Sequence, residues 1–218
     1  MLKRTTLIER LQKLPDVFDL KLFCLNTGIE HNSAKVMMSR WAKRGYIKLA
    51  GPKAGIYFKC AGASMDPSEQ TLAAVLHLYP SATLCGASVL HRNGWTTQIP
   101  RSIQVAIEDR PSLVLLHGVD LFPRSTQWFT TISQNRAFEP NPRVSLETPS
   151  SRIRVMRPAW ALADLRSFKD GWIPDEDDLD LPDDQLTSGD LNHAQTILNA
   201  LNLTEPMDDD ECASIPCA

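Results

Sequence analysis

Cysteine is scarce in this chain, and the few cysteines are poorly placed for cross-linking or metal binding. There are five in 218 residues, and no two stand in a C-x-x-C pair. We therefore expect neither a disulfide framework nor a zinc site. Three lie in apolar or strand-like stretches, where a free cysteine behaves as a small hydrophobic residue, which favours a reducing, cytoplasmic compartment. The five are Cys24, Cys60, Cys85, Cys212 and Cys217.

Long apolar runs are missing as well. The run from Leu113 to Leu116 is far too short to cross a bilayer, and Lys3 and Arg4 are not followed by the apolar stretch of a secretory signal. We expect no membrane partner. The 43% apolar composition of the 218 residues is typical of a globular protein with one large domain or two small ones.

The common enzyme motifs are absent: there is no P-loop, no G-x-S-x-G turn and no dinucleotide-binding G-x-G-x-x-G. Glu108 and Asp109 follow a predicted strand and could form the acidic pair of a nuclease, because divalent metals bind hard oxygen ligands. A third carboxylate and a suitably spaced lysine are missing, so we favour two carboxylates at the start of a loop. Gly86-Ala87-Ser88 is similar to the Gly-Ser of nucleotidyltransferases, but no strand-borne aspartates follow it.

The histidines are too scattered for a metal site. His77, His91 and His117 form no H-x-x-x-H pair and have no carboxylate companion at ligand spacing. We therefore predict no metal, no cofactor and no enzymatic activity.

Positive charge is absent from the last part of the chain and concentrated in the first. Residues 1–60 hold twelve Lys and Arg against four Asp and Glu, whereas residues 170–218 hold fourteen acidic residues and no Lys or Arg. The formal net charge of −3 conceals this asymmetry. A polyanion such as DNA would meet the field of the N-terminal segment.

The basic segment contains a stretch, Asn32 to Lys59, that is typical of a recognition helix followed by a β-wing. Asn32 or Ser33 can cap a helix that ends before Gly45. Two short alternating strands, residues 46–49 and 56–59, follow and are joined by a turn that carries Lys53. One helix face is apolar through Ala34, Met37 or Met38, and Trp41. The predicted DNA contacts on the other face and the wing are Ser33, Lys35, Ser39, Arg40, Lys43, Lys48 and Lys53.

Two further helices are expected upstream, at residues 2–14 and 18–25, with Gly28 in the turn before the third. The order helix, helix, turn, helix, wing is that of a winged helix-turn-helix. The alternative is an amphipathic helix packed on a hairpin, which would make this segment a non-enzymatic protein-interaction module without specific DNA binding.

The small-residue break at residues 61–67 predicts a flexible domain boundary. Beyond it we expect helices at 68–79, 81–90 and 159–168, and strands at 103–107, 113–116, 127–132 and 152–156. The fold class is thus α+β. The predicted domains are a winged helix-turn-helix at 1–62, an α+β domain at 66–170 and an acidic, partly disordered tail at 171–218 with one short helix starting at Asp190.

Two stretches of the middle domain resemble AbiEi-type antitoxins. Residues 87–100, ASVLHRNGWTTQIP, resemble the family's small-residue helix that runs into a G-(L/W)-T-x-Q-(I/V)-P turn. Residues 152–164 resemble its later strand, followed by a proline-led helix that ends in Ala-Leu-x-Asp. Together with the wing, the resemblance covers about residues 1–170. This chain departs from the pattern at Trp95, at Ala159 and in the long tail.

The resemblance implies a repressor and antitoxin of a type IV toxin–antitoxin system. In that family the winged helix binds the double-stranded DNA of its own promoter, and the following domain opposes a nucleotidyltransferase-like toxin. Contacts from the second domain could form a homodimer on DNA.

Two features have alternative interpretations. Trp95 either fills the core or forms a contact surface with the polar residues after it. The acidic tail is either solvated or covers the basic winged helix.

Overall fold

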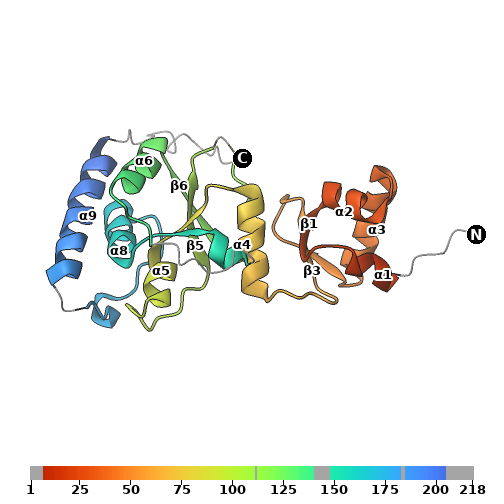
Figure 1. Ribbon diagram of the computed structural model, residues 1–218, viewed down its shortest axis with the longest axis horizontal. Helices are drawn as coiled ribbons and strands as arrows, with labels where there is room; N and C mark the ends of the chain where they lie inside the picture. Colours follow the sequence, from red (N-terminus) through yellow and green to blue (C-terminus); the bar gives the residue numbers. More distant parts are fainter. Residues whose placement is uncertain (1–6, 111, 140–147, 183–184, 205–218) are drawn as a thin grey trace, which may run out of the picture.

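The computed structural model describes residues 7–110, 112–139, 148–182 and 185–204 and has the expected α+β fold. A small N-terminal unit with three helices and three short strands stands beside a larger unit built on a four-stranded sheet (Figure 1). Within the described ranges, no helix is long and apolar enough to span a membrane.

The N-terminal unit has the element order of a winged helix. Its strand order is β1-β3-β2, and β3 pairs antiparallel with both neighbours. In chain order the elements are α1 (Leu7–Gln12), β1 (Val17–Asp19), α2 (Leu20–Thr27), α3 (His31–Lys43), β2 (Ile47–Leu49) and β3 (Ile56–Lys59). The strand β1 occupies the start of the segment for which we had predicted only a helix.

The turn between α2 and α3 is set by its capping residues. The carboxylate of Asp19 accepts a hydrogen bond from the backbone N–H of Leu22 and begins α2, and Gly28 ends it in the left-handed conformation at φ 67°. The predicted cap at Asn32 or Ser33 is wrong, because α3 begins at His31 after Glu30, which makes no side-chain cap. The two side chains are therefore helical and exposed.

The core of the N-terminal unit lies between its helices and its sheet. Trp41 is 5% exposed, and its ring meets Phe23 edge to face at 5.4 Å between centroids. Ala34 and Met38 are buried on the same side of α3. This confirms the predicted apolar face of α3, with Met38 rather than Met37 fully inside.

The larger unit is built on the sheet β6-β5-β4-β7, in which only the β4–β5 pair is antiparallel. Helix α8 lies at its centre, with eight of its eleven residues buried. The elements are α4 (Pro67–Leu78), β4 (Thr83–Leu84), α5 (Gly86–Arg92), β5 (Ile103–Glu108), β6 (Val119–Arg124), α6 (Thr126–Gln134), α7 (Pro149–Arg152), β7 (Arg154–Val155), α8 (Pro158–Phe168), a 3-10 turn at Glu176–Asp178 and α9 (Gln185–Thr204).

Two predicted strands of this unit are wrong. Residues 113–116 form no strand, and Leu115 is 57% exposed on the connection between β5 and β6. Residues 127–132 belong to α6. The Ser125 hydroxyl accepts a hydrogen bond from the backbone N–H of Trp128 and caps the start of this helix. Trp128 and Ile132 are buried on one face of the helix. The predicted helix at 81–90 is shorter, since strand β4 precedes it.

A buried ionic cluster joins α8 to the sheet. Arg124 on β6 donates to Asp164 on α8 at 2.9 Å and also binds Asp170, while the indole N–H of Trp128 donates to Asp164 at 2.7 Å. Burial raises the pKa of Asp164 despite these partners. The aspartate of the antitoxin-like Ala-Leu-x-Asp sequence thus has a structural position.

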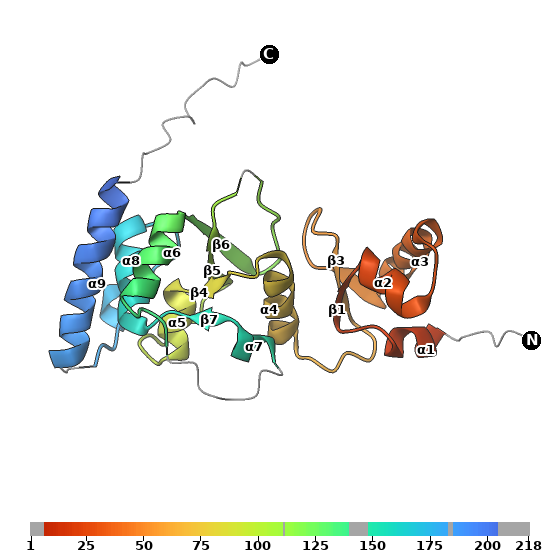
Figure 2. The same cartoon turned by 45° about the horizontal axis from the view of Figure 1, so that its top comes forward.

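The segment after residue 170 is not a solvated tail with one short helix. Helix α9 is twenty residues long, packs along α8 (Figure 2), and buries Ala194, Leu198 and Leu201 in the core of the larger unit. Before it, the carboxylate of Asp178 accepts hydrogen bonds from the Thr97 and Gln98 backbone N–H groups at 3.0 and 3.1 Å. The other predicted acidic stretch, residues 208–211, lies outside the described residues.

The link between the two units is fixed by hydrogen bonds rather than flexible. The carboxylate of Asp16, 3% exposed, forms an ion pair with Lys59 at 2.9 Å. It also accepts hydrogen bonds from the backbone N–H groups of Ser64 and Met65 at 2.7 and 2.6 Å. Burial alone would raise the pKa of Asp16, but Lys59 and these donors outweigh it and lower the pKa to about 2.

Candidate nucleic-acid interface

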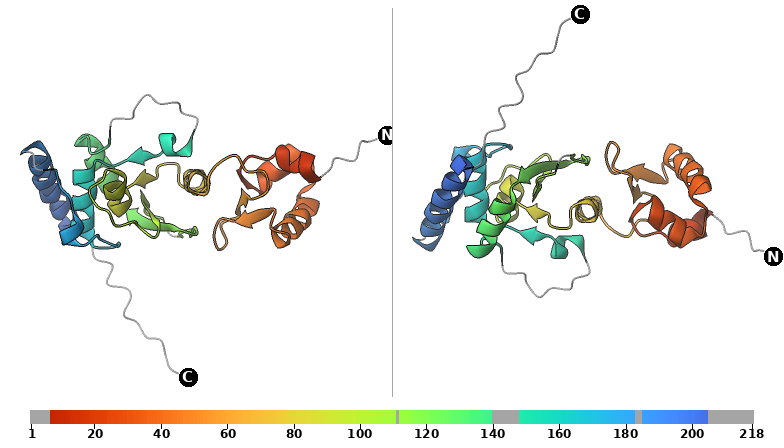
Figure 3. Two further views of the ribbon diagram at one scale, coloured as in Figure 1. Left: turned by 90° about the horizontal axis from the view of Figure 1, so that it is seen from below. Right: turned by 90° about the horizontal axis from the view of Figure 1, so that it is seen from above.

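Helix α3 has one face turned to solvent along its whole length. It lies in the part of the N-terminal unit away from the larger unit (Figures 1 and 3), so the larger unit does not cover it. Its outward residues include Lys35, Arg40 and Lys43, all exposed. Within the described ranges none of these three cations forms an ion pair with a carboxylate. The exposed side of α3 therefore carries positive charge that no carboxylate of the described residues pairs with.

The structure brings most of the predicted DNA contacts together. Ser33, Lys35, Ser39, Arg40 and Lys43 are exposed on α3. Lys48 is exposed on β2, which follows α3 after the left-handed Gly45 at φ 73°. The five residues on α3 form what we call the α3 face.

Lys53 is separated from the α3 face. It is exposed, but the wing turn that carries it packs against the β5–β6 connection of the larger unit. The backbone N–H of His117 donates to the carbonyl of Ala50 at 2.9 Å. A Cβ atom at Gly51 would overlap the carbonyl oxygen of Leu115 and lie 2.8 Å from the Cα atom of Leu116. The wing thus serves as a contact between the two units.

Tyr79 holds the β5–β6 connection in the position where it meets the wing. Its hydroxyl accepts a hydrogen bond from the backbone N–H of Val114 at 2.8 Å and lies 3.2 Å from the carbonyl of the same residue. The guanidinium of Arg110 lies over the Tyr79 ring, 5.2 Å from its centroid. The surface against which the wing packs is therefore anchored to the end of α4.

Two residues of the outward face were missed by the sequence reasoning. The sequence predicts a capping role for Asn32, whereas the structure places it one residue inside α3, where it is exposed. Val36 had no predicted role, and it is 52% exposed on the same face. The signal was present in the sequence, because Asn32, Val36 and Arg40 stand four residues apart and such residues share one face of a helix.

The candidates for catalysis are not brought together. Glu108 and Asp109 are exposed at the end of β5, and in the described ranges no three His, Cys, Asp or Glu residues could jointly hold a metal ion. The Nε2 atom of His77 lies 3.5 Å from the Asp19 carboxylate, so this histidine contacts the N-terminal unit.

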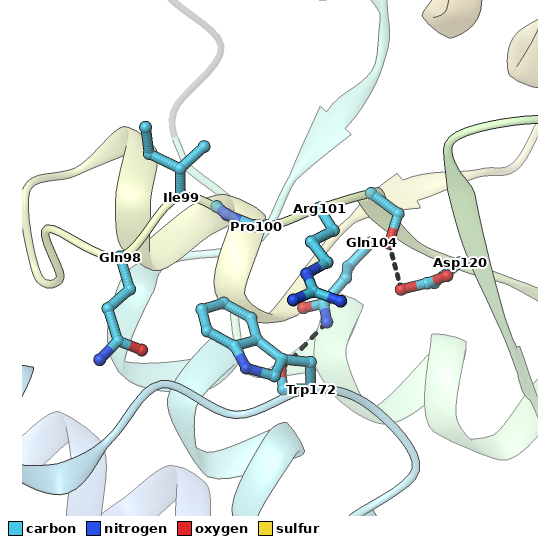
Figure 4. A pocket seen from close by; sticks show the side chains of 8 residues that line it. Gln98, Ile99, Pro100, Arg101, Gln104, Asp120 and Trp172 are labelled. Atoms are coloured by element: carbon cyan, nitrogen blue, oxygen red, sulfur yellow. Dashed lines mark hydrogen bonds between the residues drawn. The ribbon is translucent and has the colours of Figure 1, made fainter.

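A hollow of about 690 Å³ lies on the larger unit beside Trp172 (Figure 4). Its buried polar side chain is already engaged: the amide oxygen of Gln104 accepts from the Ala87 N–H at 2.5 Å, and its nitrogen donates to the Trp172 carbonyl at 3.1 Å. Ser102 donates to Asp120. The exposed side chains in its lining are Ile99, Arg101 and Trp172, whose exposed fraction is 42%.

The turn after α5 is a packing element. Trp95 is 8% exposed in the core of the larger unit, which confirms the interpretation that it fills the core. The hydroxyls of Thr96 and Thr97 donate to the Asp178 carboxylate and, with the neighbouring backbone N–H groups, lower its pKa to about 2. Within residues 170–182, the acidic segment after α8 is therefore held on this turn rather than on the winged helix.

Comparison with known proteins indicates a fold but no family. No family model matches the sequence, and no curated protein matches it. The chain is similar to the crystal structure of the RV2827C protein from Mycobacterium tuberculosis, with a TM-score of 0.54 and 16% sequence identity. The similarity covers 90% of this chain and 80% of that one. At this identity the comparison shows that the two chains share an overall fold.

Proposed function

We propose that this chain binds double-stranded DNA by placing α3 in the major groove. The observation that carries the proposal is the α3 face, which is exposed, cationic and unpaired on the second helix of a helix-turn-helix. A helix has the width of the major groove, and lysine and arginine on it gain free energy by releasing counterions from the phosphates.

Of the four acidic residues in this part of the chain, Glu9 and Glu30 are exposed, and the other two are engaged within the structure. Asp16 faces inward and is paired with Lys59, and Asp19 caps α2 and meets His77. Residues 1–60 thus retain most of their excess of positive charge for an external partner. The strongly acidic segment lies on the larger unit, where Asp178 is bound to the turn after α5.

We further propose that DNA binding represses the chain's own operon and that the larger unit opposes a nucleotidyltransferase-like toxin. This part rests on the resemblance of residues 87–100 and 152–164 to AbiEi-type antitoxins. The protein then acts as a non-enzymatic, cytoplasmic repressor and antitoxin. Co-expression with the neighbouring open reading frame tests it: the chain should relieve the toxicity of that gene product, and unchanged toxicity would refute the antitoxin role.

The DNA-binding proposal is tested by fluorescence anisotropy with the upstream promoter fragment and the full chain. The double variant Arg40→Ala, Lys43→Ala should lose affinity by about 2 kcal/mol or more, because both cations leave the groove surface. The matched control is Arg92→Ala, Arg101→Ala, which removes two exposed cations from the larger unit. Equal affinities for the two double variants would overturn the docking of α3.

The docked wing favours one alternative, a module that uses the helix-turn-helix for protein contacts only. The salt dependence of the binding affinity distinguishes DNA binding from protein binding. DNA binding should weaken steeply with salt, with a slope of about −0.9 per phosphate contact, whereas an apolar protein contact would not. The α3 double variant should lower the slope by about 0.9 for each of the two cations that reaches a phosphate.

A further inference from the structure

Val36 is an apolar residue at the centre of a polar, cationic surface. The buried side of α3 is defined by Ala34, Met38 and Trp41. At about 100° per residue, Val36 points almost directly away from that side, as does Lys43. Its side chain is 52% exposed. Val36 is therefore the apolar residue that an approaching partner of α3 would meet first.

Local physics gives no reason for a valine at this position. A β-branched side chain loses rotamer freedom in a helix, and an exposed apolar side chain gains nothing from the core. The neighbours on the outward face, Asn32, Ser39 and Arg40, are polar and well suited to water. A small apolar side chain in the middle of this polar face would be matched by a small apolar group on the partner.

The major groove of DNA displays one such group, the C5-methyl of thymine. We propose that Val36 packs against a thymine methyl, while Asn32, one helical turn earlier, pairs with the adenine of an adjoining A·T pair. This inference rests on the proposed function and specifies the DNA that it takes. Asn32 has the amide that matches the adenine edge, and Arg40, one turn later, has the guanidinium that matches guanine. The preferred site therefore combines A·T pairs with a neighbouring G·C pair.

The test uses the full chain and duplexes selected from a randomised library, so no prior operator is needed. Each thymine of the selected site is replaced in turn by deoxyuridine, which removes the methyl group and keeps the base pair. One replacement should weaken binding by the wild-type chain about fourfold, the value of one buried methyl group. Val36→Ala removes two of the methyl groups that would meet the thymine, so this variant should reduce the difference to less than about twofold. The matched control is Ile8→Ala, which shortens another exposed apolar side chain, 66% exposed on α1, and should keep the fourfold difference.

The outcomes separate the inference from the proposal beneath it. If the wild-type chain selects sites without thymine, or tolerates every deoxyuridine, the role of Val36 is wrong although DNA binding stands. A fourfold difference that persists in Val36→Ala would also overturn it. If no duplex is selected at all, the proposed function itself fails. Because Val36 is 52% exposed, Val36→Ala leaves the core intact, and its melting temperature should match that of the wild-type chain.

Discussion

Removing the carboxylate of Asp16 should destabilise the N-terminal unit more than any other single charge change there. The substitution Asp16→Ala leaves the Lys59 ammonium buried, 8% exposed, with the Leu14 carbonyl at 3.1 Å as its remaining partner. It also frees the backbone N–H groups of Ser64 and Met65. Breaking a buried ion pair from one side costs about 3–5 kcal/mol, and we expect a loss in this range.

The same contacts make the stability of the N-terminal unit depend on pH. The pKa of Asp16 falls from 3.8 to about 2 on folding, which corresponds to about 2 kcal/mol of stability. Because the folded pKa is the lower one, this stability is present above about pH 4 and is lost as the pH falls through 2. The stability lost when Asp16 is protonated is smaller than the stability lost in Asp16→Ala, because the protonated side chain still fills its site and keeps some of its hydrogen bonds.

The assay is denaturant unfolding of the full chain, followed by hydrogen exchange of residues 14–65, at pH 7 and between pH 4 and 2. The double variant Asp16→Ala, Lys59→Met should be more stable than Asp16→Ala alone, because it removes the uncompensated charge. The control Asp109→Ala, at an exposed site, should change stability by less than about 0.5 kcal/mol. A loss below about 1 kcal/mol in Asp16→Ala, or an unchanged acid sensitivity, would refute the reasoning.

Three further changes test other parts of the structure. Trp41→Ala should cost about 3–5 kcal/mol, because it empties the core beside Phe23; an unchanged melting temperature would reverse the assigned faces of α3. Gly51→Ala should cost about 1–3 kcal/mol and speed exchange of the His117 amide, since the added methyl overlaps the β5–β6 connection; unaltered exchange would contradict the wing contact. Asp178→Asn should lower the protection of the Thr97 amide against exchange and remove the change in its protection factor between pH 4 and 2, and equal protection in both proteins would argue against the bound acidic segment.

The sequence predicted those elements whose boundaries and faces depend on local spacing. The apolar face of α3, strands β2 and β3, and helices α4 and α8 all lie where period and turn residues placed them. The α6 segment failed because its aromatic and β-branched residues favour strand, although Ser125 offered a helix cap and Trp128 and Ile132 the helical spacing. Its side chains find their partners on α8, which no local pattern reveals.

In the candidate site, too, local spacing predicted some residues correctly, whereas the positions of others depend on contacts distant in sequence. Exposure of the α3 face follows from the helical period, so the sequence sufficed for Lys35, Arg40 and Lys43. The three residues of β1 form a strand because they pair with the free edge of β3, which lies about forty residues later in the sequence. Asp19 ends this strand and also caps the helix that follows it, α2. The position of Lys53 depended on contacts more than sixty residues away in sequence, which local spacing cannot anticipate.

The docked wing changes what DNA binding by this chain requires. A free wing adds phosphate contacts beside the recognition helix, but here the backbone of Ala50 is bonded to His117 and Gly51 lies against Leu115. Lys53 thus lies beside the larger unit. Affinity must then come mainly from α3 and Lys48, which makes Arg40 and Lys43 a larger share of the total than a full set of winged-helix contacts would. For this reason the α3 double variant, rather than Lys53→Ala, is the more decisive test of DNA binding.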